Sequence, residues 1–334
     1  VAAACQLLLA KPEATLDDVL AVMPAPDYPG GAQIISDPAQ IREAYRTGRG
    51  TLRVRARYQF EELARSQWRL VVTELPPETS SAQVLSEVEA ITNPKPRKGK
   101  KTLSAEQQQS KAAMLAVLSR VRDESDKNVP VRLVFEPKTC KIDREAFVAA
   151  LFAKTSLEGN SPMILVMLGA DGRPKQKPLL EILKEWVAFR VGAVRKRSET
   201  KLGKLRDRIH VLEGREKVLL NIDEVIRIIR TSDDPKPELV EAFALTDRQA
   251  EDILELKLRQ ISRLSEIAIE KELKDARKDA ASLEALLASE AKLARAVSRE
   301  IGADAKAYGD ERRTLVKPAE ALQAVQQVLD EPVT

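Results

Sequence analysis

The side chains that could carry acid–base or nucleophilic chemistry are few in this chain of 334 residues, which holds one histidine, two cysteines and four tyrosines. His210 lies beside an apolar helical position, with no serine or zinc-ligand pattern around it, so we expect a structural role. Cys5 and Cys140 are far apart in sequence and suggest neither a disulfide framework nor a metal knuckle. The acidic cluster at 122–126 could hold a cation, but a salt-bridged turn is the simpler interpretation.

Basic side chains offer a second kind of chemistry, the contact of phosphate groups. Arg53, Arg55 and Arg57 alternate within an expected strand at 51–60, which would place all three on one face. Phosphate contact needs only a positive charge and a long side chain, and arginine has both. The alternative interpretation is that these arginines form a solvated surface without a ligand. A basic, proline-containing loop at 93–101 adds further candidates. The predicted DNA-contacting residues are Arg53, Arg55, Arg57, Lys95, Arg97 and Lys98.

The bulk composition limits the class of protein. Hydrophobic residues make up 43% and charged residues 32%, which is typical of a globular chain with long solvated helices. Aromatic residues are only 4%, which disfavours a platform that stacks single-stranded bases. A net charge of +4 permits a nucleic-acid partner, and no apolar run approaches the length of a membrane span. The chain opens on Val1 without a leader pattern, so we expect a cytoplasmic domain of a longer protein.

The elements that must position these groups fall into two regions. Up to about residue 175, short strands mix with helices, which indicates one α/β domain after an initial helical stretch. Thr15 is expected to cap a helix within 1–23, and the proline- and glycine-rich segment 24–50 is expected to be a loop. We expect strands at 51–60, 68–75 and 130–137, and helices at 80–91 and 104–121.

From Pro178 onward, helical periodicity dominates, and two seams have coiled-coil spacing. The segments that carry them can pair antiparallel as a projecting arm, with two core helices of a bundle as the alternative. The expected descending seam comprises Ile182, Trp186, Phe189, Ala193, Leu202, Leu205, Ile209 and Leu212. The expected returning seam comprises Ile269, Leu273, Ala276, Ala280, Leu283, Leu287, Ala294, Val297 and Ile301.

Between the seams lies a segment that should form the tip of the arm. The stretch 221–230 is amphipathic, and Thr246 with Gln249 forms a capping box ahead of a helix that runs to 264. That helix carries apolar residues over more than one face, so it should bury one face in its own domain and another against a partner. The predicted dimer-interface residues are Ile253, Leu254, Leu256, Leu258 and Ile261.

Many ordered segments resemble a single family and together cover nearly the whole chain. They are PAPDYPGG (24–31), AYRTGRG (44–50), VTELPPETSSAQVL (72–85), RDESD (122–126), LFAKTSL (151–157), DGRP (171–174), LLEILKEWVAFR (179–190), HVLEG (210–214), NIDEVIRIIR (221–230), LTDRQAEDILELKLRQISRL (245–264) and YGDERRT (308–314). In this order they are similar to the A subunit of bacterial type IIA DNA topoisomerases. ILELKLR and the terminal EPVT resemble topoisomerase IV more than its sibling gyrase, whereas the stretch 92–118 departs from the pattern.

The resemblance implies an α+β multidomain fold, in which an α/β tower domain precedes a long antiparallel coiled-coil arm with a helical dimerisation tip. The expected parts are the end of a preceding linker at 1–23, a tower domain at 24–175, a descending coiled-coil helix at 176–218, an exit-gate dimerisation domain at 219–266, a returning coiled-coil helix at 267–302 and a closing segment at 303–334.

The family cuts DNA with a tyrosine that follows an arginine in a winged-helix domain upstream of the tower, so no catalytic residue is carried over. Arg57-Tyr58 is not that motif, because Gln59 stands where the family has threonine. The implied partners are double-stranded DNA, a second copy of the chain and the topoisomerase IV B subunit, in an A2B2 enzyme that uses ATP and Mg²⁺ through the B subunit. We therefore predict the tower and exit-gate portion of an ATP-dependent type II topoisomerase, chromosome-associated and inactive alone.

Two alternatives stay open at this point. One is the equivalent portion of a gyrase A subunit, and the other is a non-catalytic chromosome-organising coiled-coil protein. A stand-alone hydrolase is disfavoured, because the sequence offers no nucleophile–base pair. A winged-helix tyrosine upstream in the parent reading frame would separate a topoisomerase from the coiled-coil protein.

Overall fold

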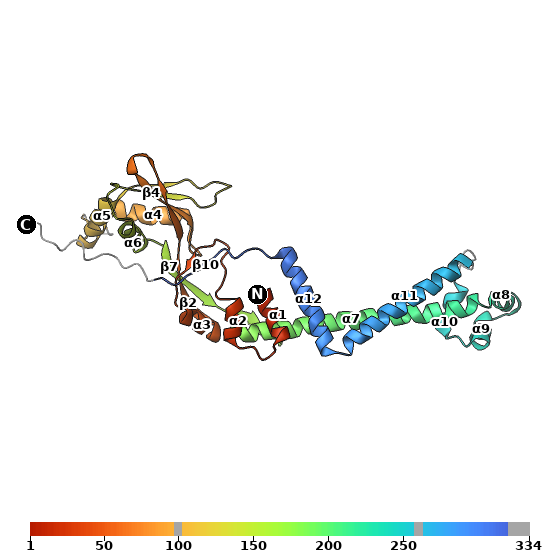
Figure 1. Cartoon of the computed structure of the whole chain (residues 1–334). Coiled ribbons are helices and arrows are strands. Elements are labelled where there is room, and N and C mark those ends of the chain that lie inside the picture. Colours follow the sequence, from red (N-terminus) through yellow and green to blue (C-terminus); the bar gives the residue numbers. More distant parts are fainter. Residues whose placement is uncertain (97–101, 257–262, 320–334) are drawn as a thin grey trace, which may run out of the picture. The chain divides into compact units, whose positions relative to one another are not determined.

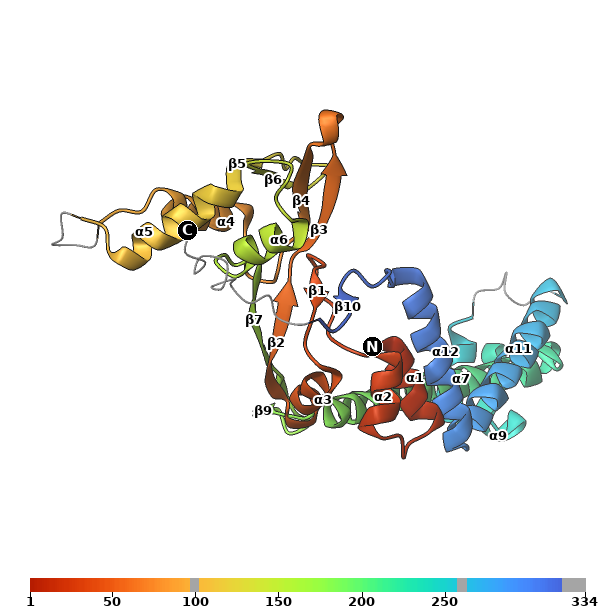
Figure 2. The ribbon, with the colours of Figure 1, turned by 60° about the vertical axis from the view of Figure 1, so that its left-hand side comes forward.

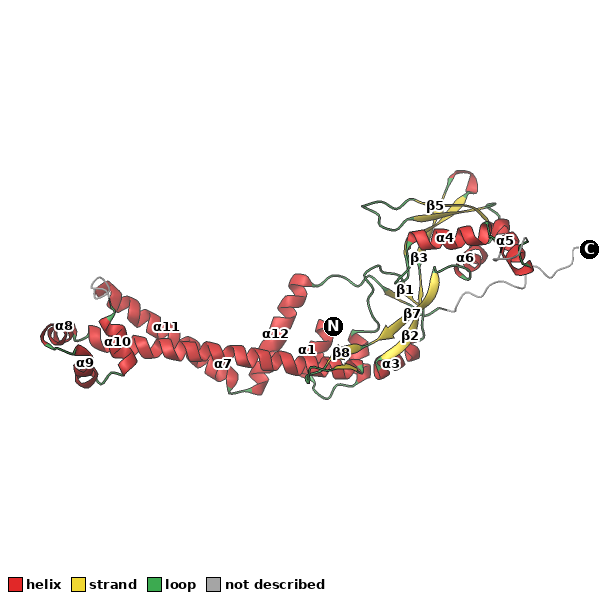
Figure 3. Cartoon of the chain, turned by 180° about the vertical axis from the view of Figure 1, so that it is seen from behind, coloured by secondary structure: helices red, strands yellow, loops and turns green. Residues whose placement is uncertain are grey.

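The computed structural model describes residues 1–96, 102–256 and 263–319 of the chain (Figure 1). The chain divides into two compact units, residues 1–185 with those from 304 onward, and residues 186–303. We call the first the mixed unit, because it holds all the strands that the structure describes, and the second the helical unit (Figure 3). The expected α+β fold with a long helical segment is confirmed.

Two short helices open the mixed unit, α1 Ala2–Ala10 and α2 Leu16–Val22. Thr15 caps α2, because its hydroxyl accepts a hydrogen bond from the backbone of Asp18 while the Asp18 carboxylate accepts one from the backbone of Thr15. This reciprocal capping confirms the predicted helix start and satisfies two backbone donors that the helix itself leaves unpaired.

The segment 24–50, which we expected to be a loop, also contains a short strand and the helix α3 Pro38–Thr47. Asp37 caps this helix through its carboxylate, and Pro38 stands in the first turn, where no backbone N–H is needed. The helix ends at Gly48, whose φ of 71° lies in the left-handed region. The loop prediction was wrong here, because aspartate followed by proline starts a helix as readily as it marks a turn.

Sheet A has the strand order β10-β1-β2-β7, in which β2 and β7 pair antiparallel over seven residues. Helix α3 covers the face of β2 that carries Gly50, because a Cβ added to this glycine would lie 2.4 Å from the Cβ of Ala44. Leu52 and Val54 lie on the same face and are fully buried. The strands are β1 Gln33–Ile34, β2 Arg49–Arg55, β7 Glu158–Ile164 and β10 Leu315–Val316.

Sheet B has the order β3-β4-β6-β5, with antiparallel neighbours throughout. The single strand predicted at 51–60 is wrong, because the chain passes from β2 to β3 at buried Ala56 and the two strands enter different sheets. The strands predicted at 68–75 and 130–137 are confirmed as β4 and β6. Bounds are β3 Arg57–Glu62, β4 Trp68–Glu74, β5 Leu118–Asp123 and β6 Leu133–Pro137, with a separate hairpin of β8 Val166–Leu168 and β9 Pro174–Gln176.

Three helices pack against sheet B and close the main core of the mixed unit (Figure 2). The helix predicted at 104–121 ends at Val117, and its last residues form β5 instead. Phe147 and Phe135 are fully buried in the core, and the ring of Phe147 meets that of Trp68 edge to face at 5.3 Å between centroids. The helices are α4 Ser81–Thr92, α5 Ala105–Val117 and α6 Arg144–Phe152, of which α6 was not predicted.

Over its described residues, the helical unit has an antiparallel arm, in which one long helix descends and two helices return, and a tip of three short helices. Exposed ion pairs join Arg206 to Glu284 and Glu213 to Arg277, so the two long helices run antiparallel, as predicted. The returning segment is broken at residues 288–289 and is therefore two helices rather than one. The helices are α7 Leu179–Leu219, α8 Ile222–Thr231, α9 Pro235–Phe243, α10 Asp247–Leu254, α11 Arg263–Leu287 and α12 Glu290–Tyr308, and the first residues of α7 and the last of α12 belong to the mixed unit.

The buried seam of the arm agrees with the prediction in its distal part. Leu202 and Leu212 on α7 are buried, as is Leu273 on α11. The proximal seam was wrong, because Trp186 is 44% and Phe189 is 73% exposed. A neighbouring row of α7 packs instead, and its buried members include Leu183, Val194 and Ser198. Two adjacent rows of this helix have near-heptad spacing, so the sequence pattern alone did not distinguish them.

Candidate nucleic-acid interface and dimer tip

The pairing of β2 with β7 decides where the predicted basic residues lie. Arg53 stands opposite Asn160 and Arg55 opposite Glu158, so the two arginines share one face of sheet A. Arg57 begins β3 in sheet B and does not belong to that face. The prediction that all three share a single strand face is therefore wrong for Arg57, because the chain changes sheets after Arg55.

Arg55 and Glu158 form a buried ion pair. The Nε of Arg55 donates to Oε2 of Glu158 at 2.7 Å, and their side chains are only 10% and 4% exposed. Arg53 contacts the other carboxylate oxygen at 3.2 Å but keeps 47% of its side chain exposed. Because removing one partner of a buried pair costs about 3–5 kcal/mol, Arg55 serves the fold, whereas Arg53 stays accessible to a ligand.

Arg57 is also engaged by a carboxylate. It donates to Glu74 at 2.9 Å and keeps 45% of its side chain exposed. The second oxygen of Glu74 accepts a hydrogen bond from the backbone of Ala32 at 2.5 Å. Of the three arginines predicted to contact phosphate, Arg53 and Arg57 are thus exposed but ion-paired.

In the predicted basic loop, Lys95 is exposed, whereas Arg97 and Lys98 lie outside the described residues.

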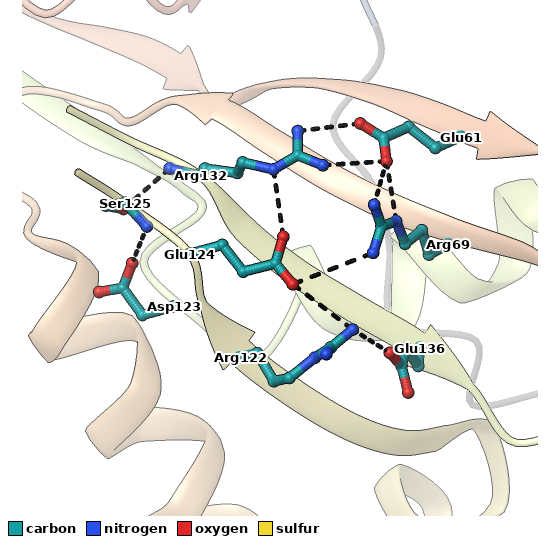
Figure 4. A network of polar contacts seen from close by, with 8 residues as sticks. All are labelled: Glu61, Arg69, Arg122, Asp123, Glu124, Ser125, Arg132 and Glu136. Atoms are coloured by element: carbon teal, nitrogen blue, oxygen red, sulfur yellow. Dashed lines mark hydrogen bonds and ion pairs between the residues drawn. The ribbon is translucent and has the colours of Figure 1, made fainter. Parts of the chain in front are cut away.

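One face of sheet B carries a network of ion pairs (Figure 4). Glu61 pairs with Arg132 at 2.9 Å and with Arg69 at 2.7 Å, and Glu124 links the same two arginines to Arg122. The hydrogen bond from Arg132, followed by that from Arg69, holds the pKa of Glu61 below its usual value. Three arginines and three glutamates make up the network, so it offers no excess positive charge to a polyanion. Its members are Glu61, Arg69, Arg122, Glu124, Arg132 and Glu136.

The acidic cluster at 122–126 forms the predicted salt-bridged turn. Asp123 accepts a hydrogen bond from the backbone of Ser125 at 2.9 Å, and Asp126 accepts from Asn128 at 2.7 Å. Arg122 and Glu124 belong to the network on sheet B. The carboxylates of this segment therefore stabilise the turn between β5 and β6.

At the tip, the predicted capping box ties two helices together. Thr246 caps α10, and its hydroxyl also lies 2.7 Å from Nε2 of His210 on α7. The amide of Gln249 donates to the backbone carbonyl of His210 at 2.6 Å. Gly214 makes this approach possible, because a Cβ there would come within 2.8 Å of Gln249. These contacts fit the structural role predicted for His210.

The predicted dimer-interface residues separate into buried and exposed groups. The predicted helix 246–264 is not continuous, because α10 ends at Leu254. Ile253 is 4% exposed and packs in the core of the tip, so within this chain it stabilises the fold of the tip. Leu254 is 37% exposed and lines, with Leu256, a largely apolar groove of about 560 Å³. Leu258 and Ile261 lie outside the described residues.

Helix α8 supplies the rest of this apolar surface. Ile226 is 38% and Ile229 is 41% exposed, and both line the groove. Val225 and Ile228 on the same helix are buried in the tip core. The signal was present in the sequence, because four apolar residues in two adjacent pairs give an α-helix two apolar rows. One row fills the core, and the other is exposed.

A search for helices that could cross a membrane finds none of sufficient length and hydropathy among the described residues.

A family model that describes the A subunit of DNA gyrase/topoisomerase IV matches residues 1–302. The chain belongs to this family. It is similar to the DNA topoisomerase 4 A subunit of Neisseria gonorrhoeae, with 50% identity over 327 residues that cover 98% of this chain and 43% of that protein. The protein of the same name from Escherichia coli is 41% identical over 337 residues, covering 100% of this chain and 42% of the relative. The Pseudomonas aeruginosa protein is 39% identical over the same length.

Membership of the gyrase/topoisomerase IV A-subunit family confirms the resemblance found in the sequence, and these relatives carry the topoisomerase IV name. A coiled-coil protein unrelated to topoisomerases is thereby excluded. The chain spans less than half the length of the curated relatives it matches.

Proposed function

We propose that this chain is the tower and exit-gate portion of the DNA breakage-reunion subunit of a topoisomerase IV-type enzyme. In this role the mixed unit contacts the flanks of a cleaved duplex, and the helical unit holds two subunits together. The observation that carries the proposal is the family match over residues 1–302, which includes both the strand-rich region and the arm. The apolar groove at the tip and the exposed arginine on sheet A supply the two surfaces that this role requires.

The dimer contact is proposed to form through the exposed apolar residues of α8 and the end of α10. Ile226, Ile229 and Leu254 are each more than a third exposed on one groove, which is unusual for a solvated surface. A two-fold dimer uses such a patch twice and removes it from water. Because a topoisomerase gate must open and reclose, the contact should be modest in area and have two discrete states.

A charge placed on this surface tests the dimer. Ile229→Asp and Leu254→Asp should each give a folded monomer, because an aspartate buried without a counter-ion costs several kcal/mol. Leu115→Asp, on an equally exposed leucine of α5, is the matched control and should stay dimeric. Light scattering with circular dichroism at micromolar concentration measures both properties. A monomeric unsubstituted chain would contradict the exit-gate assignment.

The chain alone is proposed to be unable to cut DNA. Tyr58 packs edge to face against Phe60 and Phe152, and burial raises the pKa of Tyr45, which makes its hydroxyl a poorer nucleophile at neutral pH. Mixed with a B subunit, ATP and Mg²⁺, the chain should neither relax supercoiled DNA nor form covalent adducts. An adduct that disappears in Tyr58→Phe would contradict this proposal and identify the nucleophile.

A further inference from the structure

The uncovered face of β2 presents a row of polar and basic side chains. Because α3 covers the face that carries Gly50, the alternate residues Arg49, Thr51 and Arg53 lie on the opposite face, and all three are exposed. Their partners on β7 are Ile164, Pro162 and Asn160, which are all exposed and of which only Asn160 is polar. Figure 2 shows α3 beside one end of the β2–β7 pair. Arg49 was not among the predicted contacts, because it lies in a segment expected to be a loop.

This row leads into a polar cavity of about 570 Å³. Lys154 lines the cavity with its side chain exposed and makes no ion pair with any described residue. The Ser156 hydroxyl oxygen is buried and has no hydrogen-bond partner among the described residues, although its backbone N–H donates to Glu87 at 2.6 Å. The cavity is lined by Arg53, Glu87, Phe152, Ala153, Lys154, Thr155, Ser156 and Glu158.

The charges around this cavity are arranged to leave basic groups accessible. Buried Arg55 forms an ion pair with Glu158, and part of the Arg53 guanidinium contacts the same carboxylate. A guanidinium has five N–H donors in a planar fork, so Arg53 keeps donors for an external anion while its position is fixed. The charged residues that line the cavity are two basic ones, Arg53 and Lys154, and two acidic ones, Glu87 and Glu158. Arg55 neutralises Glu158 from the buried side, and Arg49 adds a further exposed cation on β2.

We propose that this row and cavity bind the phosphodiester backbone of duplex DNA, with Arg49, Arg53 and Lys154 as the contacting cations. The inference rests on the proposed function and gives it a specific site. Arg49 and Arg53 are four residues apart on an extended strand, about 13 Å, a distance over which one DNA strand presents several phosphates. Contacts of this kind position a duplex without reading its sequence.

A charge-reversal pair tests the site in the full chain. Arg49→Glu with Lys154→Glu changes two exposed side chains that no described residue pairs, so the fold should be unaffected by circular dichroism. The matched control is Arg120→Glu with Lys138→Glu, two exposed and equally unpaired basic residues of β5 and the segment after β6. Binding of a short fluorescein-labelled duplex is measured by anisotropy between about 50 and 200 mM salt.

The row variant should bind about tenfold more weakly at low salt, and its plot of log affinity against log salt should be shallower by about 2, one for each lost phosphate contact. The control should keep the slope of the unsubstituted chain. Equal losses in both variants, or no loss in the row variant, would overturn the site while leaving the proposed function intact. Failure of the unsubstituted chain to bind duplex at low salt would instead overturn the proposed DNA-contacting function itself.

Inorganic phosphate at constant ionic strength distinguishes a backbone contact from a site for one free phosphate. Under the proposal, phosphate leaves the melting temperature of the chain and its duplex affinity unchanged. A melting temperature that phosphate raises in the unsubstituted chain but not in the row variant would overturn the assignment to a DNA backbone.

Discussion

The mixed unit and the helical unit bury their apolar side chains in different ways. In the mixed unit, Phe135, Phe147 and Phe152 are almost fully enclosed between sheet B and its helices. In the arm of the helical unit, two helices bury a single seam that includes small residues such as Ala276 and Ala280. A thick core loses many contacts when one side chain is truncated. The stability of a thin seam depends more on how closely the two helix backbones approach each other.

The two units also differ in how deeply some of their ion pairs are buried. In the mixed unit, Glu158 is 4% exposed and is paired with buried Arg55. In the arm, several pairs lie on the surface, as between Arg208 and Glu272, which are 43% and 46% exposed. Water and salt screen such exposed pairs, so their contribution to stability should be small and dependent on ionic strength. The unfolding free energy of the mixed unit should therefore respond most to truncation of core side chains. That of the helical unit should respond most to changes in how closely its helix backbones approach.

Truncation of the thick core should give the largest effect. Phe147→Ala removes a fully buried ring that contacts Trp68, so the unfolding free energy of the mixed unit should fall by about 3–5 kcal/mol. The chain has two tryptophans, Trp68 in the mixed unit and Trp186 in the helical unit. Urea unfolding followed in Trp68→Phe and Trp186→Phe backgrounds separates the two transitions.

Leu115→Ala is the control for this truncation. Leu115 is 41% exposed on α5, so its replacement should lower the unfolding free energy only a little. The transition reported by Trp186 should not move in Phe147→Ala. If both transitions shift together, the two units unfold as one, and the contrast between them has no energetic meaning.

Backbone fit in the helical unit can be tested at two glycines of α7. Gly214→Ala should destabilise the tip by about 1–3 kcal/mol, because the new Cβ meets Gln249 at 2.8 Å. Gly203→Ala should instead stabilise the helix by about 0.5–1 kcal/mol, because nothing lies within 4 Å of its Cβ and alanine favours helix. Thermal unfolding followed by circular dichroism measures both. A Gly214→Ala chain at least as stable as the unsubstituted one would show that contact between α7 and α10 does not limit the stability of the tip.

The sequence predicted the elements whose signals are local. Thr15 and Thr246 begin helices through capping boxes, and both starts are confirmed. The long helix from Leu179 was visible as sustained periodicity, and its distal seam through Leu202 is buried as expected. These predictions succeeded because the partners of each signal lie within a few residues along the chain.

Predictions that depended on distant partners failed more often. Whether Arg57 shares a face with Arg53 depends on the switch of sheets at Ala56, which no local pattern reveals. Ile253 proved to be a core residue because α8 and α9 fold back onto it. Glu158, the counter-ion of two arginines, lies 103 residues from Arg55, so its role was invisible before the strands were paired.

The ion-pair network on sheet B should make the mixed unit sensitive to acid. Hydrogen bonds from Arg132 and then Arg69 lower the pKa of Glu61 in the folded chain. A carboxylate with a depressed folded pKa contributes stability above its unfolded pKa of about 4.3, and that contribution is lost as pH falls through the folded value. Glu61→Gln should therefore flatten the loss of unfolding free energy between about pH 4.5 and 3, measured by urea unfolding.

Glu89→Gln is the control for this profile, because Glu89 is exposed on α4 and its side chain pairs with no described residue. It should give the same pH profile as the unsubstituted chain. An identical profile for Glu61→Gln would show that the network on sheet B does not contribute to the acid sensitivity of the mixed unit.

The smallest effect is expected from the exposed ion pairs of the arm. A double-mutant cycle on Arg208→Ala and Glu272→Ala should give a coupling energy of about 0.2–1 kcal/mol at low salt, because both side chains are more than two-fifths exposed. The coupling should vanish near 1 M salt, where the Debye length is about 3 Å. Circular dichroism melts of the four chains at both salt concentrations measure it. A coupling above about 2 kcal/mol that survives high salt would mean that the arm, like the mixed unit, relies on desolvated pairs, because screening cannot reach charges from which water is excluded.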